Sequence, residues 1–409
     1  MRALALIDGE HYPPVVRDAL AEVPHEVVGA VLVGGTEKIR GGEDYGVPLI
    51  ELEDGLGRAD VVVDLSDEPV LGPRERFRLA SRVLAAGLPY EGADFRLEPP
   101  RFEPFELPSL SIVGTGKRVG KTAVAGYLAR LLSQDREVVV VAMGRGGPAE
   151  PEVAQVRPTL ADLLELSRGG RHAASDYLED AALAGVVTVG CRRCGGGLAG
   201  QVSVSNVSAG ARLALERAPD LVIFEGSGAA LPPIETDRRI LVAGAQQPPE
   251  LLSGYLNAYR ILISDLVVLT MADDGHEEAV QAIGEVSAVP VIPVVLRPRP
   301  VDSVAGRRVA FFSTAPEPAL ERLSSHLGDE HGADVVLASG NLARREPLRE
   351  EAEGVDADVF LVEIKAAAID VVAEVADERG IDVVFADNEV LPVPGAPDLD
   401  AAVREVAAL

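Results

Sequence analysis

Residues 111–128 have the sequence SIVGTGKRVGKTAVAGYL, which is the most informative stretch for the fold. It overlaps an apolar run, Leu110–Val113, that predicts a buried strand, and it opens a predicted helix at residues 121–132. A glycine-rich turn between a strand and a helix is the context in which a phosphate-binding loop forms. The stretch therefore predicts a phosphate loop at Gly114–Thr122. The alternative is a tight strand-to-helix turn with an incidental Lys-Thr pair.

The side chains of this loop have the chemistry that ATP phosphates and magnesium require. Glycines let backbone N–H groups turn toward the β- and γ-phosphates, and the helix start adds partial positive charge. We expect Lys121 to neutralise phosphate and the Thr122 hydroxyl to coordinate Mg²⁺. Two of the chain's four lysines, Lys117 and Lys121, lie in the loop, and we expect both to be catalytic. The residues expected to contact ATP are Gly114, Thr115, Gly116, Lys117, Arg118, Val119, Gly120, Lys121 and Thr122.

Apolar strands alternate with helical segments and predict an α/β protein around a mostly parallel, doubly wound sheet. Residues 109–300 form the predicted P-loop NTPase domain. Residues 1–95 predict a separate N-terminal α/β domain, and the proline-rich residues 96–108 predict a linker. Residues 301–409 predict a C-terminal α/β portion. The buried strands expected from residue 109 onward are 110–113, 138–142, 186–189, 221–224, 240–242, 266–270, 291–295, 309–313, 334–338, 359–362 and 383–385.

Length and charge restrict the class of protein and its partners. A chain of 409 residues is too long for one ordinary core and should form two or three domains. A formal net charge of −27 argues against a nucleic-acid partner, because binding backbone phosphates requires a broad basic surface. No apolar run approaches the roughly 18 residues that span a bilayer, so no membrane partner is expected. We expect a cytoplasmic homodimer.

Two carboxylate positions follow from the predicted elements. Glu225 comes directly after the predicted strand at residues 221–224. Ligands of doubly wound sheets bind at the carboxyl ends of strands. We expect Glu225 to bind Mg²⁺ opposite the phosphate loop; the alternative is a solvated acid at a strand end. In residues 172–183, Asp176 and Asp180 are four apart and share one helix face. Asp180 is interpreted as a solvated helix acid.

The only two cysteines enclose a pair of arginines in the segment VGCRRCGGGLAGQ, residues 189–201. Cys191 and Cys194 supply only half of a four-sulfur zinc site, and nothing else indicates a redox dithiol. A metal that bridges two subunits and an inert loop both remain open interpretations.

Arginines near the predicted strand ends are the candidates for binding an anionic substrate. Guanidinium groups bind phosphates through two parallel hydrogen bonds, and adjacent glycines can offer backbone donors. We expect the arginines between the two cysteines to be catalytic as well. The residues expected to bind substrate are Arg192, Arg193, Gly195, Gly196, Arg238 and Arg239.

Two further strand ends carry polar side chains. Asp8, Glu10 and His11 follow the first strand of the N-terminal domain and could contact substrate or only cap a helix. Thr270 and Asp273 lie at a predicted strand end from which they could contact the nucleotide base. The sequence does not establish a role for either group of residues.

The loop GTGKRVGKT resembles that of dethiobiotin synthetase and its relatives. The usual phosphate loop has glycine at the position of Thr115, whereas that family has Gly-Thr at the start and Val-Gly-Lys-Thr at the end. A similar Glu-Gly-x-Gly follows a strand in that family, as at Glu225 here. Its metal-binding Asp lies in a Ser-Asp pair at a comparable place, so the resemblance implies Asp176 as a third Mg²⁺ ligand.

Motifs along nearly the whole chain resemble the cyclic 2,3-diphosphoglycerate synthetase family. They are IDGEHYPPVVR, VLVGGTEKIR, GTGKRVGKT, SDYLEDA, GCRRCGGG, FEGSGAALPPIETDRR and GAQQPPELLSGYLNAYRILISD. The resemblance implies that 2,3-diphosphoglycerate and ATP give cyclic 2,3-diphosphoglycerate, ADP and phosphate. It also implies a small anionic phosphorylated substrate as the binding partner.

The implied reaction fits the predicted site residues. A ring cannot close between two phosphates until one of them carries a good leaving group, which transfer of the γ-phosphoryl group of ATP would provide. Lysine, arginine and magnesium would stabilise the accumulating negative charge. The alternatives are an ATP-dependent ligase of the dethiobiotin or cobyrinic-acid type, and a nucleotide-switched metallochaperone or assembly ATPase that uses the cysteines as a metal relay.

Overall fold

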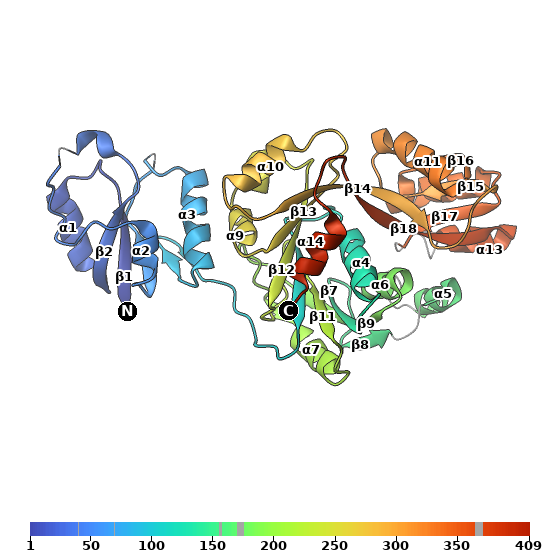
Figure 1. Ribbon diagram of the computed structural model, residues 1–409, viewed down its shortest axis with the longest axis horizontal. Coiled ribbons are helices and arrows are strands. Elements are labelled where there is room, and N and C mark those ends of the chain that lie inside the picture. The colour runs from blue at the N-terminus through green and yellow to red at the C-terminus, as the bar shows by residue number, and fades with distance from the viewer. Residues whose placement is uncertain (40, 69, 155–157, 170–175, 365–370) are drawn as a thin grey trace.

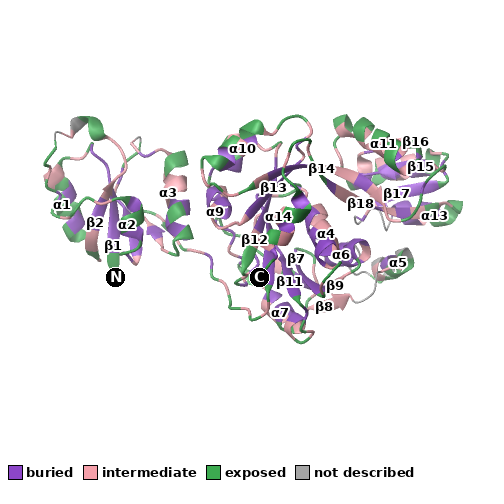
Figure 2. Cartoon of the chain, viewed as in Figure 1, coloured by how far each residue is buried: buried purple, intermediate pink, exposed green. Residues whose placement is uncertain are grey.

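The computed structural model describes residues 1–409 except 40, 69, 155–157, 170–175 and 365–370 (Figure 1). Three α/β parts follow one another along the chain, with the N-terminal part at the left of the view. The fold class expected from the sequence is confirmed. Buried residues run along the strands of each sheet, and exposed residues lie mainly on the outer helix faces and loops (Figure 2).

The N-terminal domain is a five-stranded sheet in the order β2-β1-β3-β4-β5. Strands β2, β1, β3 and β4 are parallel, whereas β5 is antiparallel to β4. This sheet extends two residues into the predicted linker. Its strands are β1 (Arg2–Ile7), β2 (Glu26–Leu32), β3 (Val61–Asp64), β4 (Tyr90–Glu91) and β5 (Arg96–Leu97), and its helical elements are α1 (Pro13–Glu22), η1 (Thr36–Lys38), α2 (Leu52–Leu56) and α3 (Pro73–Ala85).

The central domain has the phosphate loop in the middle of its sheet. Strands β9, β7, β11, β6, β12, β13 and β14 are parallel neighbours in that order. All residues of β6, β7 and β11 are buried, as expected where helices cover both faces of a parallel sheet. The strands are β6 (Ser109–Gly114), β7 (Val138–Gly144), β8 (Glu152–Ala154), β9 (Val187–Cys194), β10 (Val204–Ser205), β11 (Leu221–Glu225), β12 (Arg238–Gly244), β13 (Leu266–Thr270) and β14 (Val291–Pro300).

Helices of the central domain cover this sheet, and α4 starts at the phosphate loop. Its residues Val124, Leu128 and Leu132 are spaced by four and are fully buried against the strands. The helices are α4 (Lys121–Leu132), α5 (Leu160–Arg168), α6 (Asp176–Ala184), α7 (Val207–Leu215), α8 (Pro249–Leu252), α9 (Asn257–Leu262) and α10 (Glu277–Gly284).

The C-terminal part continues the same sheet. The long strand β14 pairs antiparallel with β18, so that the central and C-terminal strands form one 13-stranded sheet. Beyond β18 the order is β17-β15-β16, all parallel. The elements are β15 (Arg308–Phe312), α11 (Glu317–His331), β16 (Asp334–Ser339), η2 (Asn341–Ala343), α12 (Arg345–Gly354), β17 (Val359–Glu363), α13 (Ala373–Arg379), β18 (Asp382–Pro392) and α14 (Leu399–Val406).

The last helix returns to the central domain. Leu399, Val403 and Ala407 are buried in the same apolar cluster as Leu128 of α4 and Ile240 of β12. Figure 1 shows α14 in red beside α4 and the central strands, away from the other C-terminal helices. The C-terminal part is therefore joined to the central domain both by β14 and by α14.

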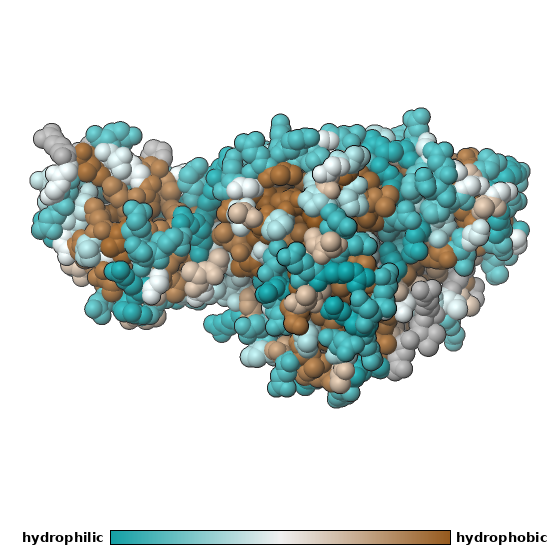
Figure 3. Space-filling view, in the orientation of Figure 1, coloured by the Kyte–Doolittle hydropathy of each residue, from teal (hydrophilic) through white to brown (hydrophobic). Residues whose placement is uncertain are grey.

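The N-terminal domain contacts the central domain through α3. The rings of Phe77 and Tyr255 lie 5.6 Å apart, and Arg78 forms an ion pair of 2.7 Å with Glu285. Polar side chains cover much of the molecular face in Figure 3, as the large negative charge requires. Among the helices in the described part of the chain, none has the length and apolar character needed to cross a bilayer.

Replacing Leu399 by alanine should destabilise the central domain although the residue lies at the end of the chain. Leu399 is 2% exposed and fills space in the central core. A buried Leu→Ala change costs about 2 to 5 kcal/mol. Urea denaturation of Leu399→Ala measures the loss. Leu409, 48% exposed, is the matched control, and Leu409→Ala should stay within about 0.5 kcal/mol of the wild type. Equal stability of the two variants would contradict this assignment of α14.

Candidate active site

The predicted phosphate loop lies between β6 and α4, at the carboxyl end of the sheet. Two glycines are required by its conformation and packing. Gly120 has a positive φ of 76°, and a Cβ there would lie 2.6 Å from Leu296 Cδ1. A Cβ at Gly114 would lie 2.9 Å from the carbonyl oxygen of Gly228. The loop is therefore closely enclosed by the neighbouring strand ends.

Polar contacts with neighbouring strands hold the loop in place. Thr115, the residue that departs from the usual loop pattern, donates its N–H to Val242 O at 3.1 Å and its hydroxyl to Gln247. Thr270 donates its hydroxyl to Val119 O at 2.7 Å. Thr270 is fully buried, so its interpretation as a base-reading residue is wrong. Its hydroxyl instead supports the loop backbone.

Lys121 and Glu225 form a buried ion pair at the centre of the site. Lys121 is the first residue of α4, and Glu225 is the last residue of β11. Lys121 Nζ contacts Glu225 Oε1, and the two side chains are 9% and 1% exposed. The structure therefore brings the predicted phosphate-binding lysine and the predicted metal-binding carboxylate together.

A second buried carboxylate, Asp180 on α6, faces the same pair. Asp180 is 3% exposed, so its interpretation as a solvated helix acid is wrong. Burial and the negative charge of Glu225 raise its pKa well above the ordinary value, and Lys121 opposes this shift. Asp176 begins α6, but its side chain lies outside the described residues. Its metal role stays a prediction.

The oxygens at this place fit a magnesium ion. Among the described residues, neither carboxylate oxygen of Asp180 nor Glu225 Oε2 accepts a hydrogen bond from a donor group, although all three atoms are buried. The Asp180 and Glu225 carboxyl groups can share a proton, which also raises the pKa of Asp180. Thr122 follows Lys121 and lines the adjacent cleft. Carboxylate and hydroxyl oxygens are the protein ligands that Mg²⁺ prefers. Thr122, Glu225 and Asp180 could therefore hold the ion beside the phosphate loop.

A cleft of about 1260 Å³ opens in front of the loop. One wall comes from the central domain and includes residues 116–123, 144–146 and 227–228. The other wall comes from the C-terminal part, where residues 313–317 follow β15 and residues 339–341 lie at the end of β16. Both sets of parallel strands thus direct their carboxyl ends toward one space. This arrangement is typical of ligand sites in α/β proteins.

Ion pairs and hydrogen bonds organise the boundary between the two walls. Arg322 on α11 reaches across to Asp273, which follows β13, with an N–O distance of 2.8 Å. Arg297 also contacts Asp273, and the two arginines lower its pKa against the opposing effect of burial. Asp273 is therefore engaged in joining the two walls. On the C-terminal wall, Ser313 donates its hydroxyl to Glu363 at 2.6 Å.

The predicted substrate-binding arginines do not act as one pair. Arg193 donates to the carbonyl oxygen of Ser227 at 2.7 Å and to that of Gly195 at 3.0 Å, so it supports the loop after Glu225. Arg192 is exposed and, as its immediate neighbour in β9, points to the opposite face. Gly196 lies beside Arg193, since a Cβ there would be 3.5 Å from Arg193 Nη1.

Arg145 is a cleft residue that sequence reasoning missed. It follows β7 in the segment Gly144-Arg145-Gly146-Gly147 and lines the cleft. A Cβ at Gly228 would lie 2.8 Å from Arg145 Nη2. Its position after a buried strand and between glycines was the available sequence signal.

The two cysteines point to opposite faces of β9. Cys191 packs in an apolar cluster, and burial raises its pKa to about 12, whereas Cys194 is exposed. Residues three apart in a strand cannot direct their side chains to one point. The interpretation of this pair as a metal relay within one chain is therefore wrong. A metal that bridges two subunits stays an open interpretation.

Arg238 and Arg239 lie away from the phosphate loop. They begin β12, which runs parallel to β6, and Arg238 pairs with Leu110 whereas Val242 pairs with Gly114. The two arginines are thus at the amino edge of the sheet, opposite the loop. Arg239 lies 5.3 Å from the centre of the Phe102 ring and donates to Ile263 O. The expectation that they bind substrate beside the loop is wrong.

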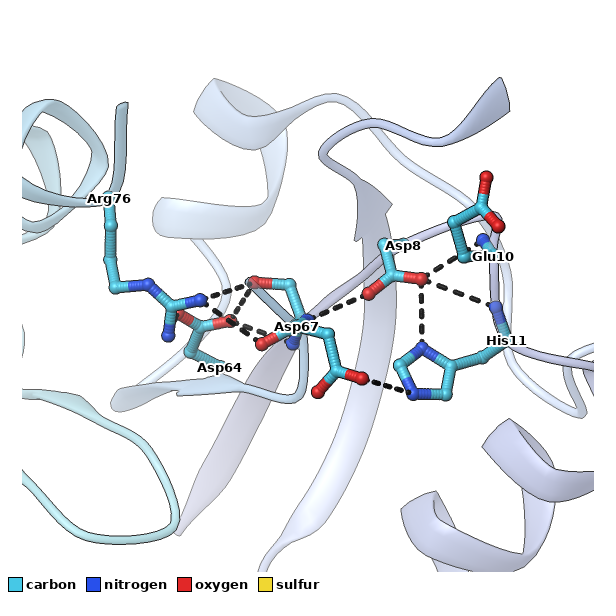
Figure 4. A network of polar contacts seen from close by, with 7 residues as sticks. Asp8, Glu10, His11, Asp64, Asp67 and Arg76 are labelled. Atoms are coloured by element: carbon cyan, nitrogen blue, oxygen red, sulfur yellow. Dashed lines mark hydrogen bonds and ion pairs between the residues drawn. The ribbon is translucent and has the colours of Figure 1, made fainter. Parts of the chain in front are cut away.

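A separate polar network lies at the carboxyl ends of β1 and β3 in the N-terminal domain (Figure 4). Asp8 is fully buried and accepts hydrogen bonds from the backbone N–H groups of Glu10, His11 and Asp67. His11 Nδ1 lies 2.8 Å from Asp8 Oδ1. None of the described residues that line the cleft comes from this domain. The network holds the turn after β1, but α1 has no side-chain capping hydrogen bond, so the interpretation of these residues as helix caps is wrong.

Comparison with known proteins gives one family along the chain. Family models described as the N-terminal, P-loop and C-terminal domains of cyclic 2,3-diphosphoglycerate synthetase match residues 2–98, 109–293 and 300–389. The synthetase of Rubrobacter xylanophilus is 53% identical, covering 100% of this chain and 97% of that protein. The synthetase of Methanothermus fervidus is 41% identical over 99% and 96% of the two chains. The synthetase of Thermococcus gammatolerans is 44% identical over 98% and 96%.

Replacing Asp180 by asparagine should stabilise the nucleotide-free protein at pH 8 and weaken binding of magnesium-ATP. The pKa of Asp180 is raised in the folded state, so the folded state loses stability as pH rises from about 4 through that pKa. Asparagine does not ionise and avoids this loss. It also removes an anionic metal ligand, which should weaken nucleotide affinity by roughly tenfold or more.

Urea denaturation at pH 5 and pH 8 measures the stability, and titration with a fluorescent ATP analogue measures the affinity. Asp329→Asn on the exposed surface of α11 is the matched control and should change neither quantity. A less stable Asp180→Asn variant at pH 8, or one with unchanged affinity, would rule out the role given to Asp180.

Proposed function

The chain belongs to the cyclic 2,3-diphosphoglycerate synthetase family, and we propose that it uses ATP to close the ring of cyclic 2,3-diphosphoglycerate. The single observation that carries this proposal is the match along nearly the full length of curated synthetases. The buried Lys121–Glu225 pair at the phosphate loop supports the proposal. These two charged groups lie where the phosphates of ATP and a metal ion would bind. The chain is therefore an enzyme of the synthetase class.

The proposed reaction has two phosphoryl-transfer steps. An oxygen of one substrate phosphate first attacks the γ-phosphorus of ATP, the bond to the β-phosphate oxygen breaks, and ADP leaves. An oxygen of the second substrate phosphate then attacks the phosphorus that is attached to glycerate. The terminal phosphate leaves as orthophosphate, and the new P–O–P bond closes the ring. Both phosphates belong to one molecule, so the second step gains from proximity.

Residues at the phosphate loop handle the charge of the first step. Lys121 would exchange its contact with Glu225 for the phosphates of ATP when the nucleotide binds. Thr122, Glu225 and Asp180 would hold magnesium, which supplies neutralising charge to the β- and γ-phosphates. Asp180 would release its proton as the cation arrives, because the positive charge offsets the repulsion from Glu225.

Arginines and the second lysine are assigned to the polyanionic substrate. Arg145 is exposed and lines the cleft beside Gly228. Lys117 and Arg118 are exposed on the same cleft. Arg193 holds the Ser227 backbone and so positions the loop that follows Glu225. The cleft thus offers cationic groups for the substrate.

The two alternative functions have less support. A metallochaperone that relays metal through Cys191 and Cys194 does not fit side chains on opposite faces of β9. A ligase of the dethiobiotin or cobyrinic-acid type would share the phosphate loop, but the curated relatives that match the full chain carry the synthetase name. The cytoplasmic location and the homodimer stay predictions.

Phosphorus NMR of the purified protein tests the reaction. With ATP, Mg²⁺ and 2,3-diphosphoglycerate, we expect cyclic product, ADP and orthophosphate in equal amounts. ADP should form only slowly when the substrate is omitted. Lys121→Ala should abolish all three products and so exclude a contaminating enzyme. Release of orthophosphate without the cyclic resonance would overturn the proposal, whereas turnover with another anionic metabolite alone would support a ligase.

Two arginine variants test the placement of the substrate. Arg145→Ala should lower kcat/KM for 2,3-diphosphoglycerate by about tenfold to a thousandfold, because it removes a cation from the cleft. Arg238→Ala is the matched control at the opposite edge of the sheet and should stay within about twofold of the wild type. Steady-state measurement of ADP release gives both values. A large loss in Arg238→Ala with little change in Arg145→Ala would instead indicate that the substrate binds at Arg238 and Arg239.

A further inference from the structure

A group of three metal-ligating side chains lies outside the active site, where α11 packs on the β14–β18 ribbon. His326 and His331 come from the last turns of α11, and Glu389 comes from β18. One ligand atom from each of the three residues lies within 4.8 Å of the other two. None of the three lines the cleft at the phosphate loop. The group is not evident in the sequence, because Glu389 is 58 or more positions away from the two histidines.

The two imidazoles present buried nitrogen atoms to this place. Within the described part of the chain, the Nε2 atoms of His326 and His331 are buried and lack a hydrogen-bond partner. The rings lie 5.5 Å apart at an angle of 75°, and His326 Nε2 is 3.6 Å from Glu389 Oε2. Leaving two buried ring nitrogens without partners costs free energy. A shared ligand would remove that cost.

We propose that His326, His331 and Glu389 bind a divalent transition-metal ion of the zinc, cobalt or nickel type. Two imidazole nitrogens with one carboxylate oxygen form a ligand set that suits these ions rather than magnesium, which prefers oxygen ligands. Three protein ligands leave a fourth position for water. Tetrahedral zinc requires ligand atoms about 3.3 Å apart, so small side-chain rotations must draw the three atoms together.

The electrostatic surroundings favour this ion. Burial lowers the pKa of His326, and His331 and Arg297 act in the same direction, so the imidazole is neutral and able to bind metal at neutral pH. Glu389 and Glu330 oppose that shift and add negative charge for a divalent cation. The side chains of His326 and Glu389 are 12% and 30% exposed, which leaves a path for the ion to enter.

A metal at this place would fasten α11 to the strand that joins the two parts of the large sheet. Helix α11 also carries Arg322, which contacts Asp273 at the edge of the active-site cleft. The ion would thus fix the position of one cleft wall without contacting the substrate. Its expected effects are a higher Tm of the protein and unchanged chemistry at the phosphate loop.

Cobalt titration of the purified full-length protein tests the site. The titration is done without nucleotide and with excess Mg²⁺, which occupies the oxygen ligands near Glu225. We expect saturable visible absorption that corresponds to one equivalent of nitrogen-coordinated Co²⁺, together with a rise in Tm. His331→Ala and Glu389→Gln should each weaken Co²⁺ binding by at least about tenfold. His276→Ala, outside the group, should bind as the wild type does.

The proposal fails if the wild type gives no saturable absorption, or if both variants bind Co²⁺ as tightly as the wild type. Should a variant not fold, diffraction at the zinc absorption edge from wild-type crystals soaked in zinc chloride decides the matter. An anomalous peak between His326 Nε2 and His331 Nε2 supports the site, and its absence overturns it. These results do not depend on whether the protein cyclises 2,3-diphosphoglycerate.

Discussion

The organisation of this protein depends on placing two buried carboxylates against one lysine. Glu225 and Asp180 come from β11 and α6, and Lys121 begins α4. One cation cannot balance two buried anions, so the raised pKa of Asp180 keeps a proton in the nucleotide-free site. The same imbalance creates affinity for a divalent cation. Without ligand the two carboxylates have too little positive charge beside them. Magnesium bound with ATP would supply that charge.

Most of the fold could be predicted from the sequence because its strands are buried on both sides. Continuous apolar runs such as Val138–Ala142 and Leu266–Thr270 predicted strands, and the glycine-rich turn predicted where α4 begins. The antiparallel β14–β18 pair was missed, because Arg297 pairs with Glu389 in the middle of the ladder and prolines interrupt the apolar pattern. The polar residues of these two paired strands do not show the hydrophobic pattern by which a strand is predicted. The pairing that unites the large sheet was therefore invisible in the sequence.

The candidate site could be predicted only in part, for reasons of geometry. The position of Glu225 could be predicted from the sequence, because it depends only on where one buried strand ends. The carboxyl ends of such strands are where ligands of α/β sheets bind. Asp180 was misinterpreted because a helical acid looks the same whether its face meets solvent or a buried lysine. The spacing of Cys191 and Cys194 suggests a shared role, but β9 continues through both residues and turns their side chains to opposite faces. Arg238 and Arg239 follow Glu225 closely in sequence, but the chain crosses the sheet between them and reaches its opposite edge.

The return of α14 to the central domain has a consequence for synthesis on the ribosome. The N-terminal domain is complete once its own residues have emerged, and it can fold while translation continues. The central core, in contrast, lacks Leu399, Val403 and Ala407 until residues 399–407 have been made. The edge of β14 also stays unpaired until β18 is made. Any prematurely terminated chain would therefore carry a nucleotide-binding loop on an unfinished core and would be an early substrate for quality-control proteases.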